Sequence, residues 1–106
     1  MSKIKKWTSI TQETKKKVYE RDNGCCIFCG SPNGLPEAHY IPRSKLGSGG
    51  ERNIVTACRY TCHMKLDSGT PKEREAYRLI ARNHLKKHYD NWNEEDLKYK
   101  KGVSYE

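Results

Sequence analysis

Residues 37–67 read EAHYIPRSKLGSGGERNIVTACRYTCHMKLD, and the rest of the chain can be placed around them. Within this stretch His39 stands just ahead of a proline and a basic loop, Asn53 opens a short apolar run, and His63 directly follows a cysteine. The three residues form an ordered series of histidine, asparagine and histidine. This series makes the stretch the first candidate for a functional site.

The same stretch predicts a unit of strand, loop, strand and helix. Residues 38–41 are expected to form a short strand that ends at Pro42, because proline has no N–H to donate to a sheet. Residues 43–52 hold three glycines and three basic side chains, which is typical of a flexible basic loop. Residues 53–57 are rich in β-branched side chains and predict the return strand. A short helix is then expected to carry Cys62, His63 and Asp67.

Two cysteine pairs flank this unit. Cys26 and Cys29 are separated by two residues, a spacing that lets both sulfurs reach one ion, and Gly30 tolerates the left-handed turn that points backbone N–H groups at the thiolates. Cys58 and Cys62 are separated by three residues, which suits ligands one helical turn apart and also a slightly widened knuckle. The sequence therefore predicts a structural Zn²⁺ held by four cysteines.

The fifth cysteine leaves other interpretations open. Cys25 could take the place of Cys26, although the two-residue spacing favours Cys26. Two disulfides with a spare thiol are a further possibility, which an odd count weakens, and so is a set of structural or redox thiols. The N-terminal segment lacks the apolar core of a secretory signal, so a reducing, cytoplasmic setting is expected, where paired cysteines more often bind metal.

The composition explains why a metal would matter for folding. With 106 residues, of which 34% are hydrophobic and 32% charged, one domain has little apolar material for a core. A structural zinc contributes on the order of 10 kcal/mol and could replace the missing burial. The net charge of +8 favours a polyanionic partner such as nucleic acid over mere solubility, and no segment is long enough to cross a membrane.

Helices are predicted on both sides of the central unit. One covers about residues 10–22, begins at a capping box of Ser9 and Gln12, and ends at Asn23-Gly24. Its apolar side is narrow and consists of Ile10, Thr14, Val18 and Tyr19. Residues 1–8 are expected to form a basic arm that is ordered only partly or on binding.

A second flanking helix covers residues 71–88. Thr70, Pro71 and Glu73 give it an N-cap, a first-turn proline and a capping-box carboxylate. A short helix capped by Asn93 and Asp96 is expected near Leu97, followed by a basic tail. The face of the 71–88 helix that should pack on the core consists of Tyr77, Ile80, Ala81, His84 and Leu85.

The residue types of the central stretch suit phosphodiester hydrolysis. That reaction needs a base for water, a cation against the charge on the phosphorane, and help for the leaving oxygen. His39 faces a basic loop and is the candidate base, since its pKa lies near neutrality. His63 lies beside a zinc cysteine and is the better metal ligand, and the Asn53 amide can bridge the loop backbone. Arg43, Lys45 and Arg52 are candidate phosphate-binding residues, or else solvated charges.

The chain resembles a small phage-type HNH endonuclease of the ββα-metal, or His-Me finger, superfamily. The resemblance covers about residues 9–101 and is carried by Cys26-x-x-Cys29, by AHYIPRS at 38–44 and by residues 53–63. It implies an α+β fold in a single domain, 1–106. A small zinc-stapled ββα-metal core at about 24–68 would carry flanking N- and C-terminal helices at about 10–22 and 71–88, and a basic tail to 106.

The resemblance also implies roles and partners. His39 would be the general base, Asn53 the residue that orders the loop, and His63 a ligand of one catalytic Mg²⁺ or Mn²⁺, with Ni²⁺ as a further candidate. The substrate would be DNA, nicked or cut in both strands to leave 5′-phosphate and 3′-hydroxyl ends. Relatives of this size imply phage DNA packaging, a terminase large subunit as a partner, a bacterial host cytoplasm, and a monomer or weak dimer.

The chain departs from the family pattern at two places. Many members carry Asp or His just before the general base as a second metal ligand, where this chain has Ala38. Asp67, one helical turn beyond His63, or Glu37, two residues before His39, could replace it, and Asp67 is favoured. The second departure is the extra residue between Cys58 and Cys62.

Other functions stay open at this point. A non-catalytic zinc module that binds DNA or a terminase is the main rival. An RNA-binding zinc protein has less support, because the aromatic residues are scattered. His84 and His88 stand four residues apart and could share a metal, although we expect one to pack and the other to be solvated.

Overall fold

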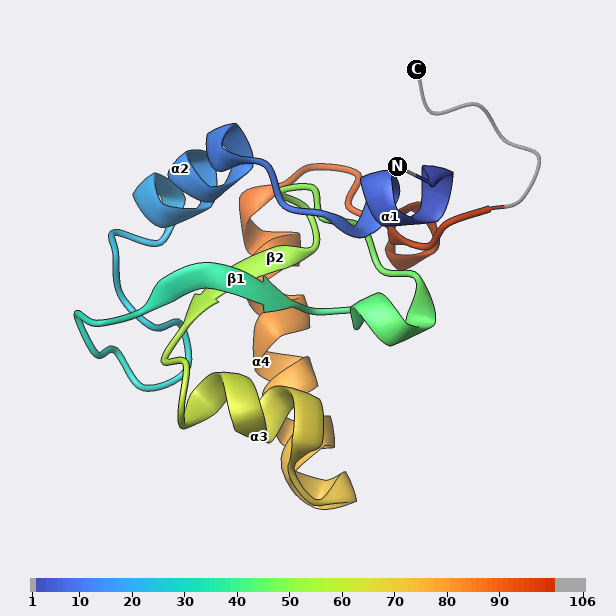
Figure 1. Cartoon of the computed structure of the whole chain (residues 1–106). Helices are drawn as coiled ribbons and strands as arrows, with labels where there is room; N and C mark the ends of the chain where they lie inside the picture. Colours follow the sequence, from blue (N-terminus) through green and yellow to red (C-terminus); the bar gives the residue numbers. More distant parts are fainter. Residues whose placement is uncertain (1, 101–106) are drawn as a thin grey trace.

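The computed structural model describes residues 2–100 and is an α+β arrangement built on one antiparallel hairpin (Figure 1). Helix α2 packs across both strands, and α3 packs against the long α4, which runs behind the sheet. The elements in chain order are α1 (Lys3–Thr8), α2 (Gln12–Arg21), β1 (Leu35–His39), the 3₁₀ turn η1 (Arg43–Lys45), β2 (Ile54–Ala57), α3 (Cys62–Ser68), α4 (Pro71–His88) and the 3₁₀ turn η2 (Glu94–Leu97).

The first strand differs from the one predicted at 38–41. β1 pairs with β2 through Leu35 opposite Ala57 and His39 opposite Ile54, and its register shifts between Leu35 and Ala38. Pro36 lies within this irregularity, where the missing N–H costs no ladder bond. The prediction of a strand that ends at Pro42 was therefore wrong, because regular pairing stops at His39.

The basic loop after β1 is tightly held, in contrast to the predicted flexible segment. A Cβ on Gly47 would lie 1.8 Å from the Ile41 carbonyl oxygen, and one on Gly49 would lie 1.9 Å from that of Ser9. Both glycines are therefore required by close backbone contacts. Gly47 also forms an isolated antiparallel bridge with Lys98, which ties the loop to the C-terminal part of the chain.

The N-terminal region is more ordered than the predicted basic arm. Residues 3–8 form α1, and the Trp7 indole Nε1–H donates to the Leu46 carbonyl oxygen at 3.0 Å. The expected capping box of the next helix was wrong. Thr11 caps α2 by accepting from the Thr14 N–H, whereas the Ser9 hydroxyl donates back to the Lys5 carbonyl oxygen at 2.6 Å. α2 ends at Arg21, just before the predicted stop at Asn23-Gly24, and both of these residues take positive φ angles.

The long helix α4 begins and ends at the predicted residues. Thr70 and Glu73 exchange both bonds of the capping box, Pro71 opens the helix, and His88 closes it. Ala81 and Leu85 are fully buried, but Ile80 is 42% exposed, so the packed face is narrower than predicted. η2 follows, capped by the Asn93 side chain, which accepts from the Glu95 N–H. The rest of the predicted basic tail, 101–106, lies outside the described residues.

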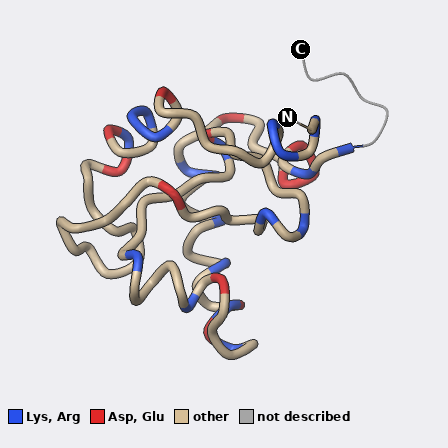
Figure 2. Tube along the Cα trace, viewed as in Figure 1, with Lys and Arg blue, Asp and Glu red and all other residues tan. Residues whose placement is uncertain are grey.

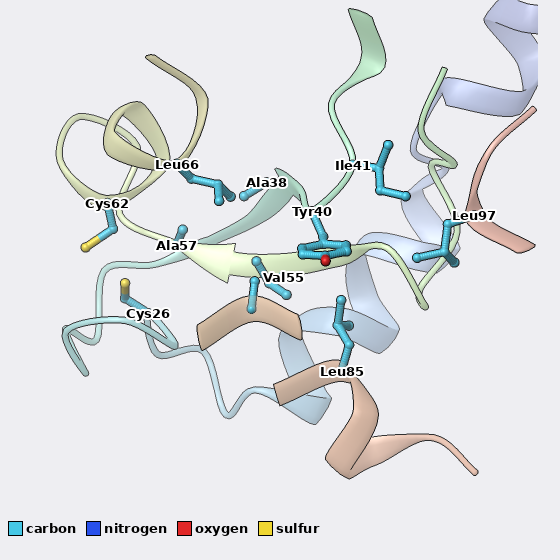
Figure 3. Packing of buried hydrophobic residues seen from close by; sticks show 11 residues of the cluster. Cys26, Ala38, Tyr40, Ile41, Val55, Ala57, Cys62, Leu66, Leu85 and Leu97 are labelled. Atoms are coloured by element: carbon cyan, nitrogen blue, oxygen red, sulfur yellow. The ribbon is translucent and has the colours of Figure 1, made fainter. Parts of the chain in front are cut away.

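A small core fills the space between the hairpin, α3 and α4 (Figure 3). Two of its members are cysteines from opposite cysteine pairs, Cys26 and Cys62, whose sulfurs lie on facing sides of one gap. The apolar core thus continues directly into the cysteine cluster. Among the described residues, no helix has both the length and the apolar character to cross a membrane.

Candidate functional site

Four cysteines from two segments of the chain, 26–29 and 58–62, converge at one end of the hairpin. Their sulfur atoms all lie within 4.8 Å of one another, and the Sγ atoms of Cys29 and Cys58 are 3.4 Å apart. A tetrahedral zinc with bonds of about 2.3 Å would place its sulfurs roughly 3.8 Å apart. The cluster could therefore hold a metal such as zinc. The contributing residues are Cys26, Cys29, Cys58 and Cys62.

The backbone around the first pair favours a thiolate. Burial raises the pKa of the Cys26 thiol, but N–H groups of Cys29, Cys58 and Phe28 donate to its sulfur and lower the pKa from 9.0 to about 7. Gly30 takes a φ of +79°, the left-handed turn predicted for it. Burial and the neighbouring Cys26 sulfur raise the pKa of Cys62 to about 12. Four thiolates this close need a cation to be stable together.

The positions of the cysteines show which of Cys25 and Cys26 joins the cluster, and which geometry the pair of Cys58 and Cys62 adopts. The thiol of Cys25 lies near the Asn23 carbonyl oxygen, at 3.4 Å, and Cys25 is outside the cluster, so Cys26 is the member as predicted. Cys58 precedes α3 and Cys62 begins it, so the pair forms a widened knuckle rather than one helical turn. All five cysteines are free thiols.

A cleft of ≈ 750 Å³ lies between β1, η1, α3 and α4 and collects most of the predicted site. Five basic and two acidic side chains line it, which makes its field positive. Its wall consists of Ser9, Ile10, Lys15, Glu37, His39, Pro42, Arg43, Ser44, Lys45, His63, Asp67, Arg74 and Arg78.

His39 lies at the end of β1, and one of its two ring nitrogens is hydrogen-bonded to the backbone. Its Nε2 lies 2.9 Å from the Thr8 carbonyl oxygen, and the residue as a whole is only 6% exposed. Because a carbonyl oxygen only accepts, Nε2 carries the proton and donates, which leaves Nδ1 as an acceptor. Burial lowers the pKa of His39 below 6.5, because it outweighs the Thr8 hydrogen bond, which raises the pKa, and the positive charge of Arg43 lowers it further. The residue is thus a neutral imidazole near neutral pH.

Asn53 is fully buried and its amide spans the loop between the strands. Its Oδ1 accepts from the Ile41 N–H at 2.8 Å, and its Nδ2 donates to the carbonyl oxygens of Ile41 and Ser48 at 3.1 and 2.7 Å. The side chain replaces a strand as the partner of Ile41, which is why regular pairing stops at His39. The amide makes the loop contacts expected of it.

His63 and Asp67 face the cleft from the same side of α3. The His63 Nε2 lies 3.0 Å from the Asp67 Oδ2, so two potential metal ligands stand together one turn apart. Glu37 also lines the cleft, but its carboxylate accepts from the Arg59 guanidinium at 2.7 Å. Within residues 2–100, His63 and Asp67 join no group of three His, Cys, Asp or Glu donors. Ala38 is fully buried in the core.

One predicted phosphate-binding residue lies elsewhere. Arg52 stands 5.1 Å over the Tyr89 ring and donates weakly to the Asp90 carbonyl oxygen, so it is away from the cleft that holds Arg43 and Lys45. Sequence reasoning weighed Lys15 evenly between phosphate binding and solvation, and it missed the arginines that α4 contributes. The signal for the latter was present, since residues 74, 78 and 82 are all Arg at four-residue spacing.

A second group of potential ligands lies on the far side of α4. Donor atoms of Asp22, His84 and His88 lie within 4.8 Å of one another. However, the Asp22 carboxylate already accepts from Arg21 at 2.7 and 2.9 Å and from the His84 Nε2–H at 2.7 Å. Its charge is neutralised by that guanidinium, so we assign Asp22 and His84 a structural role. His84 is partly buried and His88 is exposed, as predicted.

Comparison with known proteins adds no family. No protein-family model, curated protein or solved structure matches the chain.

Proposed function

We propose that the chain is a metal-dependent DNA endonuclease of the HNH type, with a ββα-metal core formed by the hairpin and α3. The observation that supports this best is the pairing of His39, whose Nδ1 is left as an acceptor, with His63 and Asp67 on the wall of one basic cleft. A base and a metal-binding pair beside positive charge are the components that phosphodiester hydrolysis requires.

In this mechanism His39 accepts a proton from the attacking water at Nδ1, while its Nε2–H stays bonded to Thr8. His63 and Asp67, which stand together on the cleft wall, would hold a divalent cation. When bound, that cation supplies stabilisation of the charge on the phosphorane and the leaving 3′ oxygen. Arg43 and Lys45 bind and orient the phosphate.

The cysteine cluster and Asn53 position these groups. Cys62 begins α3 and directly precedes His63, so a zinc on the four cysteines would fix the imidazole of His63 relative to the hairpin. Asn53 fixes the chain just after His39 through Ile41. The four cysteines and Asn53 can affect the rate of cleavage without touching the substrate, because they fix the positions of His63 and His39.

Cleavage of supercoiled plasmid tests the proposal. The wild type is incubated with Mg²⁺, Mn²⁺ or Ni²⁺ alongside His39→Ala and His88→Ala, the latter a matched control because it is exposed on α4. We expect the wild type and His88→Ala to nick the plasmid and His39→Ala to lose activity. Nicks that DNA ligase reseals would identify 5′-phosphate and 3′-hydroxyl ends.

The rival function, a zinc module that binds DNA without cutting it, predicts a different result. In that case all three proteins would retard the plasmid equally and none would nick it with any of the three metals. Ala38, which leaves the cation with few protein ligands, is the feature that favours this rival.

A further inference from the structure

A second hollow adjoins the cleft along α4. It has a volume of ≈ 500 Å³ and shares three basic residues with the cleft, namely Lys45, Arg74 and Arg78. It continues past them to Arg82, with Glu75 as its single acidic lining residue. The two hollows therefore adjoin at these residues, and the second one extends the basic surface of the cleft along the side of α4. Figure 2 shows that η1 and α4, the elements that carry these shared residues, both hold Lys and Arg positions.

Arg74, Arg78 and Arg82, which we call the arginine ridge, are spaced like a linear array of charges. Residues four apart on a helix are separated by about 6 Å along its axis and turned by only about 40°. The three guanidiniums thus follow a single gently winding line, with a separation comparable to that of successive phosphates in a nucleic-acid strand. A solvated helix surface does not require this alignment.

The ridge also lacks internal partners. The Nε atoms of Arg74 and Arg78 are buried without a hydrogen-bond acceptor, and none of the three ridge arginines forms an ion pair within residues 2–100. Buried donors are normally satisfied, and no acceptor within residues 2–100 competes for these two Nε–H groups. Arginine presents a planar set of donors that matches phosphate oxygens. The exposed Leu79 side chain beside them offers apolar contact to a sugar.

We propose that the arginine ridge is the track for the DNA strand that leaves the cleft, where it binds backbone phosphates on one side of the cleavage position. This inference rests on the proposed nuclease function and adds to it a defined exit path. Arg82 would contact a phosphate beyond the cleft, while Arg74 and Arg78 contact those at the junction. The ridge would hold the substrate without taking part in the chemistry.

Equilibrium binding tests the track independently of cleavage. In the His39→Ala background, binding of a fluorescein-labelled duplex of two helical turns is measured over a range of salt concentrations for Arg78→Gln, Arg82→Gln and Lys87→Gln. Lys87 is the matched control, because it carries the same charge on the same helix but lines neither hollow. Arg82 is exposed, so its substitution should not perturb folding, and thermal melting checks Arg78→Gln.

We expect each ridge substitution to weaken binding on the order of fivefold and to reduce the slope of log K against log salt by about 1, with Lys87→Gln unchanged. If Arg78→Gln and Arg82→Gln, both folded, bind the duplex as tightly as Lys87→Gln, the track is refuted. It is also refuted if a polyglutamate peptide binds the ridge more tightly than DNA does.

The two proposals fail in different ways. If the wild-type protein never nicks plasmid but its DNA binding depends on the ridge, the nuclease proposal is contradicted and the proposed track is supported. If the protein nicks plasmid but Arg82→Gln leaves its KM unchanged, the nuclease proposal is supported and the proposed track is contradicted. If both hold, Arg82→Gln raises KM and leaves kcat unchanged, because the contact is made equally in the ground and transition states.

Discussion

The Nε2 of His39 lies 2.9 Å from the carbonyl oxygen of Thr8, the last residue of α1. This contact joins the N-terminal helix to the candidate site and determines which ring nitrogen can accept a proton. A segment that contributes no side chain to the chemistry thus sets the tautomer of the base.

Trp7→Ala should therefore slow cleavage. The Trp7 indole anchors α1 through its bond to Leu46 and an edge contact with the Tyr99 ring, and its loss should cost roughly 2 kcal/mol of the free energy of unfolding. Without the anchor, the Thr8 carbonyl no longer holds His39, and the cleavage rate should fall at least tenfold. Trp92→Ala is the control, because Trp92 donates to Arg52 and packs on Tyr40 away from the cleft. Equal rate losses in both variants would contradict this role for α1.

Cys26→Ser should abolish metal binding and folding, whereas Cys25→Ser should retain both. Cys26 belongs to the four-sulfur cluster and the adjacent Cys25 does not. Cys25→Ser is therefore a matched control, since it makes the same substitution one residue away and leaves all four sulfurs of the cluster in place. Losing a structural zinc removes on the order of 10 kcal/mol, more than a chain with so small a core can spare. Metal analysis after dialysis, combined with circular dichroism, measures both effects. A zinc-free protein with an unchanged melting temperature would contradict the assignment.

Asn53→Ala should destabilise the fold by about 2 to 4 kcal/mol, because it leaves the buried N–H and carbonyl of Ile41 and the half-buried carbonyl of Ser48 without this partner. Asn53→Asp should be at least as damaging at neutral pH, since it places a carboxylate against the carbonyl oxygens of Ile41 and Ser48. Urea titration gives both values. Asn33→Ala, at an exposed position, serves as the control and should change stability by less than about 0.5 kcal/mol.

Asp22 should make stability sensitive to acid. Burial raises the pKa of its carboxyl, but hydrogen bonds from His84 and Arg21 outweigh burial and hold the pKa well below 3.8. The unfolded chain then takes up a proton near 3.8 while the folded chain does not, so the stabilisation is complete above that pH and is lost as the pH falls toward the folded pKa.

Asp22→Asn should accordingly cost on the order of 2 kcal/mol at neutral pH, and its deficit relative to the wild type should shrink as the pH is lowered below about 3.8. Denaturant titrations across this range, with Asp90→Asn as an exposed control, measure the deficit. A deficit that stays constant down to pH 2 would show that the Asp22 charge is not what stabilises the fold.

Local signals in the sequence predicted the parts of the structure that depend on neighbouring residues. The capping box of Thr70 and Glu73, the left-handed turn at Gly30 and the spacing of Cys26 and Cys29 each involve groups within four residues of one another. Asn53 was predictable for a related reason, since an asparagine at the start of a return strand stands within reach of the loop that precedes it.

The errors arose where distant segments meet. The close contacts of Gly47 with Ile41 and the docking of Trp7 on Leu46 turned a glycine-rich loop and a basic arm into ordered structure. Arg52 looked suitable for phosphate by its place in the loop, but the Tyr89 ring, far along the chain, holds it elsewhere. Composition alone does not determine which of several arginines faces the cleft.

The single-turnover rate of DNA strand cleavage, measured against pH at saturating Mn²⁺, tests the central claim most directly. A base with a pKa lowered below 6.5 by burial is fully active above that pH and is lost as it protonates, so the acid limb of the wild-type profile should have its midpoint below 6.5. His39→Gln should cut roughly 10² to 10⁴ times more slowly and lack that limb. A His39→Gln variant that keeps the wild-type rate and the same acid limb would contradict His39 as the base.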